Sequence, residues 1–238
     1  MNNTKYLQKM KFYAFLGFIG GIFFMIGDCL IFCYKGYSNA DIDPLWSGVA
    51  EWRFVLSAWL GFIGMALMLP AFYSYYSMIE DTCGKILRVM ATFMAIGVAS
   101  TGFLHFALGS LLPITYKSIL ASGGTEEIAV AVAEHWQHIL APLDAVLIAF
   151  LCLEYITHFA AVISGKIRLP RLMCLAGPLG AVLLGMIWKV LFKDTVMEGG
   201  WGACESLGEA LVFLTAYVYW KKKCTADNSN TTQSEKNE

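Results

Sequence analysis

The sequence contains few charged residues. Only 15% of its 238 residues are charged, whereas 58% are hydrophobic, a balance well outside that of soluble domains. The formal net charge is −1 and the basic residues form no extended patch, so nucleic-acid binding is excluded. The composition predicts an integral membrane protein whose main surroundings are the lipid bilayer.

Common catalytic and binding motifs are absent as well. The sequence has no GxSxG, P-loop, GxGxxG or HExxH pattern, and its seven cysteines include no CxxC pair. The stretch "EHWQH" at 134–138 resembles a zinc motif only superficially, because its histidines are three residues apart. An acid/base or metal-dependent reaction on a lipid needs none of these motifs and stays open, so the cofactor is not determined.

Long apolar runs are abundant instead. About 20 apolar residues suffice to cross a bilayer, and this length indicates six transmembrane helices, at about 12–34, 54–79, 89–112, 139–163, 172–192 and 203–220. The predicted fold is an all-α bundle over residues 1–223, with short cytoplasmic loops and two longer outer connections. The polar residues 224–238 are predicted to form a disordered cytoplasmic tail.

Basic residues predict the orientation of the bundle. With six spans, the positive-inside rule places both termini in the cytoplasm of a cell-membrane protein. Tryptophans near the outer ends, Trp46, Trp52, Trp136 and Trp201, are then expected to form an aromatic belt. The basic residues on the cytoplasmic side are Lys5, Lys9, Lys11, Lys85, Arg88, Lys166, Arg168, Arg171, Lys221, Lys222, Lys223 and Lys236; those on the outer side are Lys35, Arg53, Lys117 and Lys193.

Three further local features carry expectations. In the second outer connection, Thr125 is a candidate N-cap of an amphipathic helix that lies on the membrane or covers a pocket. Cys33 and Cys204, both near the outer surface, either form a disulfide or fill apolar space. Small residues spaced by four indicate close helix packing, with a homo-oligomer as the alternative: Gly17 and Gly21; Ala91, Ala95 and Ala99; Ala141, Ala145 and Ala149; Gly177, Ala181 and Gly185.

Ionisable residues in five of the six helices fall at one depth. With a rise of about 1.5 Å per residue, Asp28 and His105 each lie ~24 Å from their cytoplasmic entry points in a core ~30 Å thick. A charge that faces lipid costs several kcal/mol, so these groups are expected to face one another inside the bundle. With Arg53 at the outer start of the second helix, the candidate ligand-binding residues are Asp28, Arg53, His105, Asp144, Lys189, Glu205 and Glu209.

Single members of this set also have structural interpretations. Lys189 can extend to the lipid headgroups, and His105 can hydrogen-bond a backbone carbonyl. Asp28 can pair with Lys189, and Asp144 follows Pro142 closely enough to interact with a helix N-terminus. Glu205 can lie in water at the end of its helix.

The deeper pair Glu154 and His158 is predicted to form a local interaction near the cytoplasmic end. Along the fourth helix this pair lies ~15 to 20 Å from the layer that contains Asp144, which excludes it from the same site.

Three classes of function fit these residues. The layer is acidic, so the first is a pocket, open to the outside, that binds or moves a cation, a proton or a small amphiphile. The second is a membrane enzyme that uses a carboxylate, His105 or a metal on a lipid. The third is a structural or assembly protein in which the polar layer fixes the packing of the helices.

Overall fold

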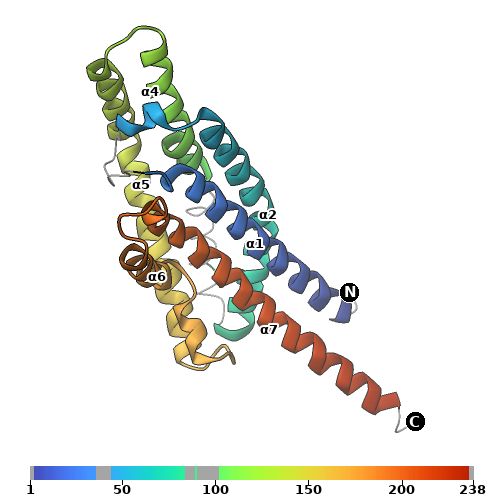
Figure 1. The fold of residues 1–238 in the computed structure, drawn as a ribbon. Coiled ribbons are helices and arrows are strands. Elements are labelled where there is room, and N and C mark those ends of the chain that lie inside the picture. Colours follow the sequence, from blue (N-terminus) through green and yellow to red (C-terminus); the bar gives the residue numbers. More distant parts are fainter. Residues whose placement is uncertain (1–2, 36–43, 84–88, 90–101, 236–238) are drawn as a thin grey trace.

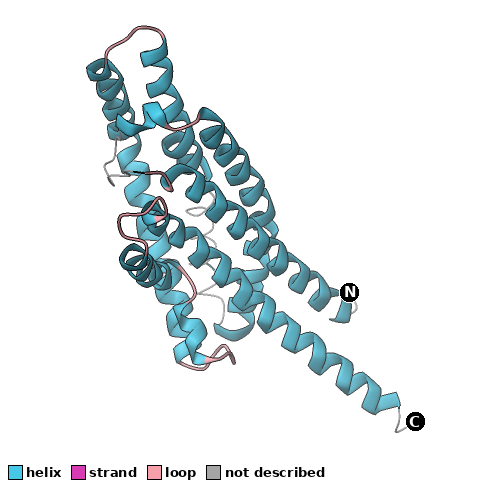
Figure 2. Cartoon of the chain, in the orientation of Figure 1, coloured by secondary structure: helices cyan, strands magenta, loops and turns pink. Residues whose placement is uncertain are grey.

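The chain folds into a bundle of long helices. The computed structural model describes residues 3–35, 44–83, 89 and 102–235, and within these ranges it contains helices and loops but no strand (Figures 1 and 2). Four of the described helices are long and apolar enough to cross a membrane: Thr4–Phe32, Glu51–Asp81, Gly102–Ala121 and Glu126–Ile163. The prediction of an all-α membrane bundle is therefore confirmed.

Helix α1 (Asn3–Phe32) lies between α2 (Glu51–Cys83) and α7 (Cys204–Glu235). In Figure 1 both chain termini lie at the same end of these helices. Close approach requires glycine: a Cβ on Gly21 would lie 2.7 Å from Ala210 Cα on α7, and one on Gly20 would lie 2.5 Å from Gly64 O on α2. The predicted packing role of the small residues in the first helix is thus confirmed.

The other rows of small residues differ in whether they pack against a neighbouring helix. A Cβ on Gly208 of α7 would lie 2.6 Å from Gly177 O and 2.7 Å from Ala181 Cβ. Helix α7 therefore packs through small residues against Gly177 and Ala181 of the predicted fifth span. Ala141, Ala145 and Ala149 are exposed, so the prediction that they pack inside the bundle is wrong. Ala91, Ala95 and Ala99 lie outside the described residues, as do Lys85 and Arg88.

At the end of the bundle opposite the termini, α4 (Leu112–Ala121) is joined by a short turn to α5 (Glu126–Ile163), which then runs back along the bundle (Figure 1). Thr125 is the N-cap of α5, as predicted, and its Oγ1 accepts a hydrogen bond from Ile128 N at 3.3 Å. The expected separate amphipathic helix is wrong, because α5 continues through Pro142 as one helix of 38 residues. The second outer connection is therefore mostly helix.

A buried cluster around Trp46 stabilises this end of the bundle. Trp46 packs edge-on against Tyr116 with ring centroids 5.8 Å apart, and it is only 6% exposed. Lys117 holds the segment that contains Trp46 by donating hydrogen bonds to the carbonyls of Ser47 (2.9 Å) and Val49 (2.8 Å). Trp46 is thus a core residue and not part of an aromatic belt, whereas Trp52 and Trp136 are exposed.

The last two predicted spans differ in length from the helices observed. The fifth is broken at Gly177, whose φ of 109° suits glycine, so that α6 (Pro178–Leu191) has only 14 residues. The sixth lies inside α7, which continues to Glu235. Predicted disorder after residue 223 is wrong for most of the tail: Cys224 is buried, and Thr4 donates a hydrogen bond to Asp227 at 2.7 Å. Contact with α1 supports the first turn of this extension.

Candidate functional site

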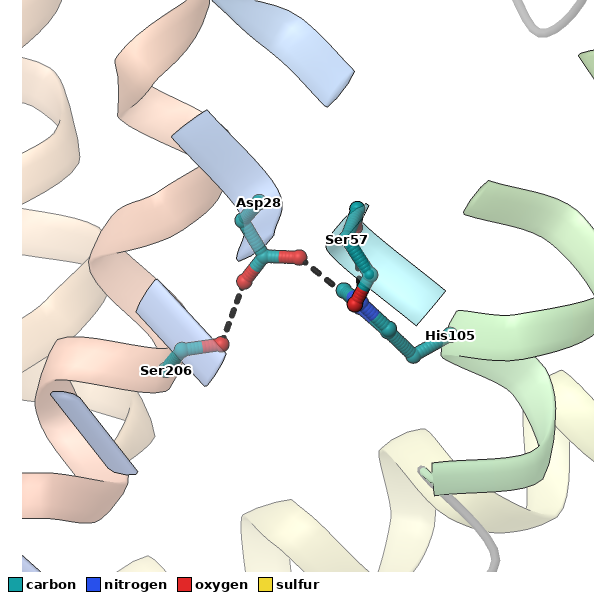
Figure 3. Close-up of polar contacts among 4 residues, drawn as sticks. All are labelled: Asp28, Ser57, His105 and Ser206. Atoms are coloured by element: carbon teal, nitrogen blue, oxygen red, sulfur yellow. Dashed lines mark hydrogen bonds and ion pairs between the residues drawn. The ribbon is translucent and has the colours of Figure 1, made fainter. Parts of the chain in front are cut away.

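Asp28 is tolerated in an apolar helix because both of its carboxylate oxygens have partners. Oδ1 lies 3.0 Å from His105 Nδ1, and Oδ2 accepts a hydrogen bond from Ser206 Oγ (Figure 3). These partners come from the helical segment 102–106 and from α7, so the carboxylate joins three parts of the bundle. The expected pairing of Asp28 with Lys189 is not what satisfies it.

His105 is held by contacts with α1 and α2. Its Nε2 lies 3.0 Å from Ser57 Oγ and 3.2 Å from the Ser57 carbonyl oxygen on α2, and its ring centroid lies 4.7 Å from that of Phe24, with the two rings tilted by 55°. A Cβ on Gly61 would lie only 2.4 Å from the His105 ring, which explains the glycine there. The predicted hydrogen bond from this histidine to a backbone carbonyl is present.

The order Asp28, His105 and Ser57 matches that of an acyl-transfer triad, but its geometry does not suit catalysis. The Ser57 side chain is fully buried, with an exposed fraction of 0%, and it does not line the adjacent cavity. A nucleophile must reach its substrate, so the arrangement serves to hold α1, α2, α7 and the segment 102–106 together.

Arg53 lies outside the site. Its guanidinium donates hydrogen bonds to Cys33 O at 2.7 Å and to Cys29 O at 3.4 Å. Cys33 directly follows α1, where backbone carbonyls lack partners within the helix, whereas Cys29 O already accepts from Cys33 N at 3.0 Å. Arg53 therefore caps the end of α1 and does not line the cavity with the other candidate residues.

A cavity of about 980 Å³ brings the other six predicted residues together. It lies between α1, α2, α5, α6, α7 and the segment 102–109. Its remaining walls are mostly apolar and include Phe24, Met65, Leu104 and Leu147. The predicted residues that line it are Asp28, His105, Asp144, Lys189, Glu205 and Glu209.

The cavity reaches the surface of the bundle between α5 and α6. Ile148 and Ile156 of α5 and Val182 and Met186 of α6 line it, yet each is more than half exposed. Side chains that both line a cavity and reach the surface mark its mouth.

Glu209 carries the least satisfied charge of the cavity wall. Only 6% of this residue is exposed, and apart from neighbouring Glu154 neither of its carboxyl oxygens has a partner among the described residues. One turn earlier on α7, Glu205 also faces the cavity, where it interacts electrostatically with Asp28 and Asp144. The prediction that Glu205 and Glu209 share a face is confirmed.

Glu154 belongs to this site, contrary to the expectation from the sequence. It is 1% exposed on α5, and its carboxyl group interacts with that of Glu209 on α7. The predicted partner His158 instead donates from Nε2 to Met173 O at 2.9 Å and lies 3.5 Å from Tyr75 OH. The distance estimated along the helix axis was misleading because it treats the helices as parallel, whereas Figure 1 shows α5 running at an angle to α7.

Sequence reasoning also missed two wall residues. Trp201, assigned to an aromatic belt, lines the cavity, and Lys189 Nζ lies 5.7 Å from the centroid of one of its rings. Ser206, adjacent to Glu205, supplies a hydrogen bond to Asp28. Its position next to an acidic residue gave no signal, because serine is common in apolar helices.

The described part of the chain supports neither a metal site nor a disulfide between Cys33 and Cys204. It contains no group of three or more His, Cys, Asp or Glu side chains placed to hold a metal ion. The thiols of Cys33 and Cys204 are both free.

Comparison with known proteins gives a family but no activity. Neither a curated protein nor a solved structure matches the chain. The model of one protein family matches residues 1–223, nearly the whole chain. The chain therefore belongs to the family of unknown function DUF6796.

Proposed function

We propose that this protein binds a small amphiphile with a positive charge in the cavity and moves it between the lipid phase and the far side of the membrane. The observation that carries this proposal is Glu209, a buried carboxyl group with no partner beyond Glu154, on the wall of a largely apolar cavity. Burying an unpaired charge is costly, so a complementary positive group in the ligand accounts for its retention.

The charges around the cavity support a cationic ligand. Four carboxyl residues line it, Asp28, Asp144, Glu205 and Glu209, against Lys189 and His105. His105 is already paired with Asp28, and Lys189 lies beside Trp201. The carboxyl groups on α7 are thus left to face the ligand.

Cavity size and position support an amphiphile rather than a bare ion. Cavities of about 300 to 1,000 Å³ hold drug-sized molecules, and this one has about 980 Å³. Its apolar mouth between α5 and α6 gives a molecule dissolved in the lipid a direct route to the carboxyl groups. A hydrated metal ion needs neither the volume nor the apolar walls.

Two probes of equal shape and opposite charge test this proposal. Purified protein in detergent is expected to bind radiolabelled tetraphenylphosphonium and to exclude tetraphenylborate. Substitution Glu209→Gln keeps the side-chain shape but removes the charge, and is expected to weaken tetraphenylphosphonium binding about tenfold or more, which corresponds to about 1.4 kcal/mol. Scintillation proximity measures both affinities.

The matched control for this experiment is Glu134→Gln, which removes an exposed carboxylate of α5 away from the cavity. Its affinity for tetraphenylphosphonium is expected to equal that of the wild type. Stronger binding of tetraphenylborate, or equal affinities of the Glu209→Gln and wild-type proteins, contradicts a cation site.

For the membrane topology we propose a multi-pass arrangement with both termini in the cytoplasm and the predicted outer layer facing outward. The basic residues near α1, α7 and the loop after α5 support it. In intact cells, a membrane-impermeant amine reagent is expected to modify the exposed Lys193 but to reach the exposed Lys166 only after permeabilisation. Mass spectrometry of the two peptides decides, and the reverse pattern reverses the orientation.

The other two functional classes account for less of the site. The enzyme class would use a carboxylate, His105 or a metal on a lipid, but His105 is engaged by Asp28 and Ser57. A purely structural role explains the network of Asp28, His105, Ser57 and Ser206, all of which have partners. It leaves Glu209 and the large cavity without a purpose.

A further inference from the structure

Two buried carboxyl groups meet at the inner wall of the cavity. Glu154 on α5 is 1% exposed and Glu209 on α7 is 6% exposed, and their carboxyl groups interact with each other. Oε2 of Glu154 and both carboxyl oxygens of Glu209 accept no hydrogen bond from the described residues. No basic group of the described chain neutralises this pair.

Electrostatics restricts the charge that such a pair can carry. Two ionised carboxylates held together away from water repel strongly, and neither can donate a hydrogen bond. One proton between them removes the repulsion and supplies the missing donor, so the pair then behaves as a single titrating unit. The state with one proton and one negative charge is therefore favoured over the doubly ionised state.

The charged groups around the pair act in the same direction. Glu205, one turn before Glu209 on α7, adds negative charge and itself lies near Asp28 and Asp144. His105 is engaged by Asp28, and Lys189 of α6 lies over Trp201. On α5, His158 is engaged by Met173 O and Tyr75.

Only Glu209 of the two carboxyl residues lines the cavity, so a ligand approaches the pair from one side. Glu154 lies behind it and does not itself line the cavity. A positive charge that reaches Glu209 stabilises the doubly ionised pair and competes with the proton.

We infer that Glu154 and Glu209 together bind one proton, and that a cation entering the cavity displaces it. The O–H bond of the shared carboxylic acid breaks, the proton leaves to water, and the electron pair stays on the carboxylate that now faces the cation. One positive charge replaces another, so the net charge of the occupied site is unchanged. The displacement step rests on the proposed function, whereas the shared proton does not.

Proton release tests the displacement step. When tetraphenylphosphonium is added to the full-length protein in weakly buffered detergent solution, a pH-indicator dye is expected to report about one proton released per cation bound, and the affinity is expected to rise as pH rises. In Glu154→Gln the amide N–H can supply the donor that the shared proton supplied, so we expect the remaining carboxylate to be ionised already and the cation to bind without proton release. Glu134→Gln is expected to behave like the wild type.

Infrared difference spectroscopy of the ligand-free protein tests the shared proton directly. The wild type is expected to show the carbonyl stretching band of a protonated, buried carboxylic acid. Both Glu154→Gln and Glu209→Gln are expected to lose it, because the glutamine amide donates the hydrogen bond that the shared proton supplied and the remaining carboxylate can then be ionised. A band that survives in both variants overturns the inference.

The outcomes separate the two proposals. If tetraphenylphosphonium binds the wild type without releasing a proton, the displacement step is wrong while the binding function stands. If tetraphenylphosphonium does not bind at all, the proposed function is wrong, and the infrared band alone decides whether the pair holds a proton.

Discussion

Substitution Gly21→Leu is expected to prevent the bundle from forming. A Cβ at this position would lie 2.7 Å from both Cα and Cβ of Ala210 and 2.8 Å from its backbone nitrogen, so the neighbouring backbone itself must move. Overpacking of a tight core costs about 1 to 3 kcal/mol, and displacement of a whole helix raises this to about 3 kcal/mol or more. Fluorescence-detected size exclusion in mild detergent should show loss of the monodisperse peak.

The control for this substitution is Ala145→Leu, which places the same side chain on an exposed position of α5. Its elution and thermal stability are expected to match those of the wild type. If Gly21→Leu gives folded protein of equal stability, close packing of α1 on α7 does not hold the bundle together. The cavity would then lack the fixed wall from which Asp28, Glu205 and Glu209 project.

The elements that hydropathy identifies best are those for which only length and polarity matter. α1 and α2 follow from their apolar runs, and Thr125 follows from the chemistry of an N-cap. Hydropathy does not show whether a polar connection is helical, and therefore α4 and α5 extend well beyond the predicted spans. The break at Gly177 and Pro178 was visible in the sequence, but its effect on the length of α6 depends on packing against Gly208.

The candidate site was predictable to the extent that burial of charge is expensive. Asp28, His105 and Glu209 interrupt apolar runs, which required partners or a ligand for each. Depth alone could not separate Arg53, which caps α1, from residues that face the cavity. Nor could it bring Glu154 to Glu209, because that contact depends on the angle between α5 and α7 and on the rotation of each helix about its axis.

Substitution Asp28→Leu is also expected to destabilise the bundle strongly. It removes the acceptor of Ser206 Oγ and the acceptor that lies 3.0 Å from His105 Nδ1. Each buried polar group left without a partner costs about 1 to 3 kcal/mol, so the loss is expected to be about 2 to 6 kcal/mol. A large drop in the thermal unfolding temperature of the purified protein is the expected result.

Asp28→Asn separates the hydrogen bonds of this residue from its charge. The amide oxygen can still accept from His105 Nδ1, and Ser206 can turn its hydroxyl group to accept from the amide nitrogen, so most of the network survives. The loss of stability is therefore expected to be smaller than for Asp28→Leu and to equal roughly that of Ser206→Ala. Because Asp28 and Ser206 are in contact, the double variant Asp28→Asn with Ser206→Ala should lose less than the sum of the single losses. If the losses are additive, or if the Asp28→Leu protein is as stable as the wild type, no network holds α1 to α7 through Asp28. The ligand would then be the remaining reason for a carboxylate in this apolar helix.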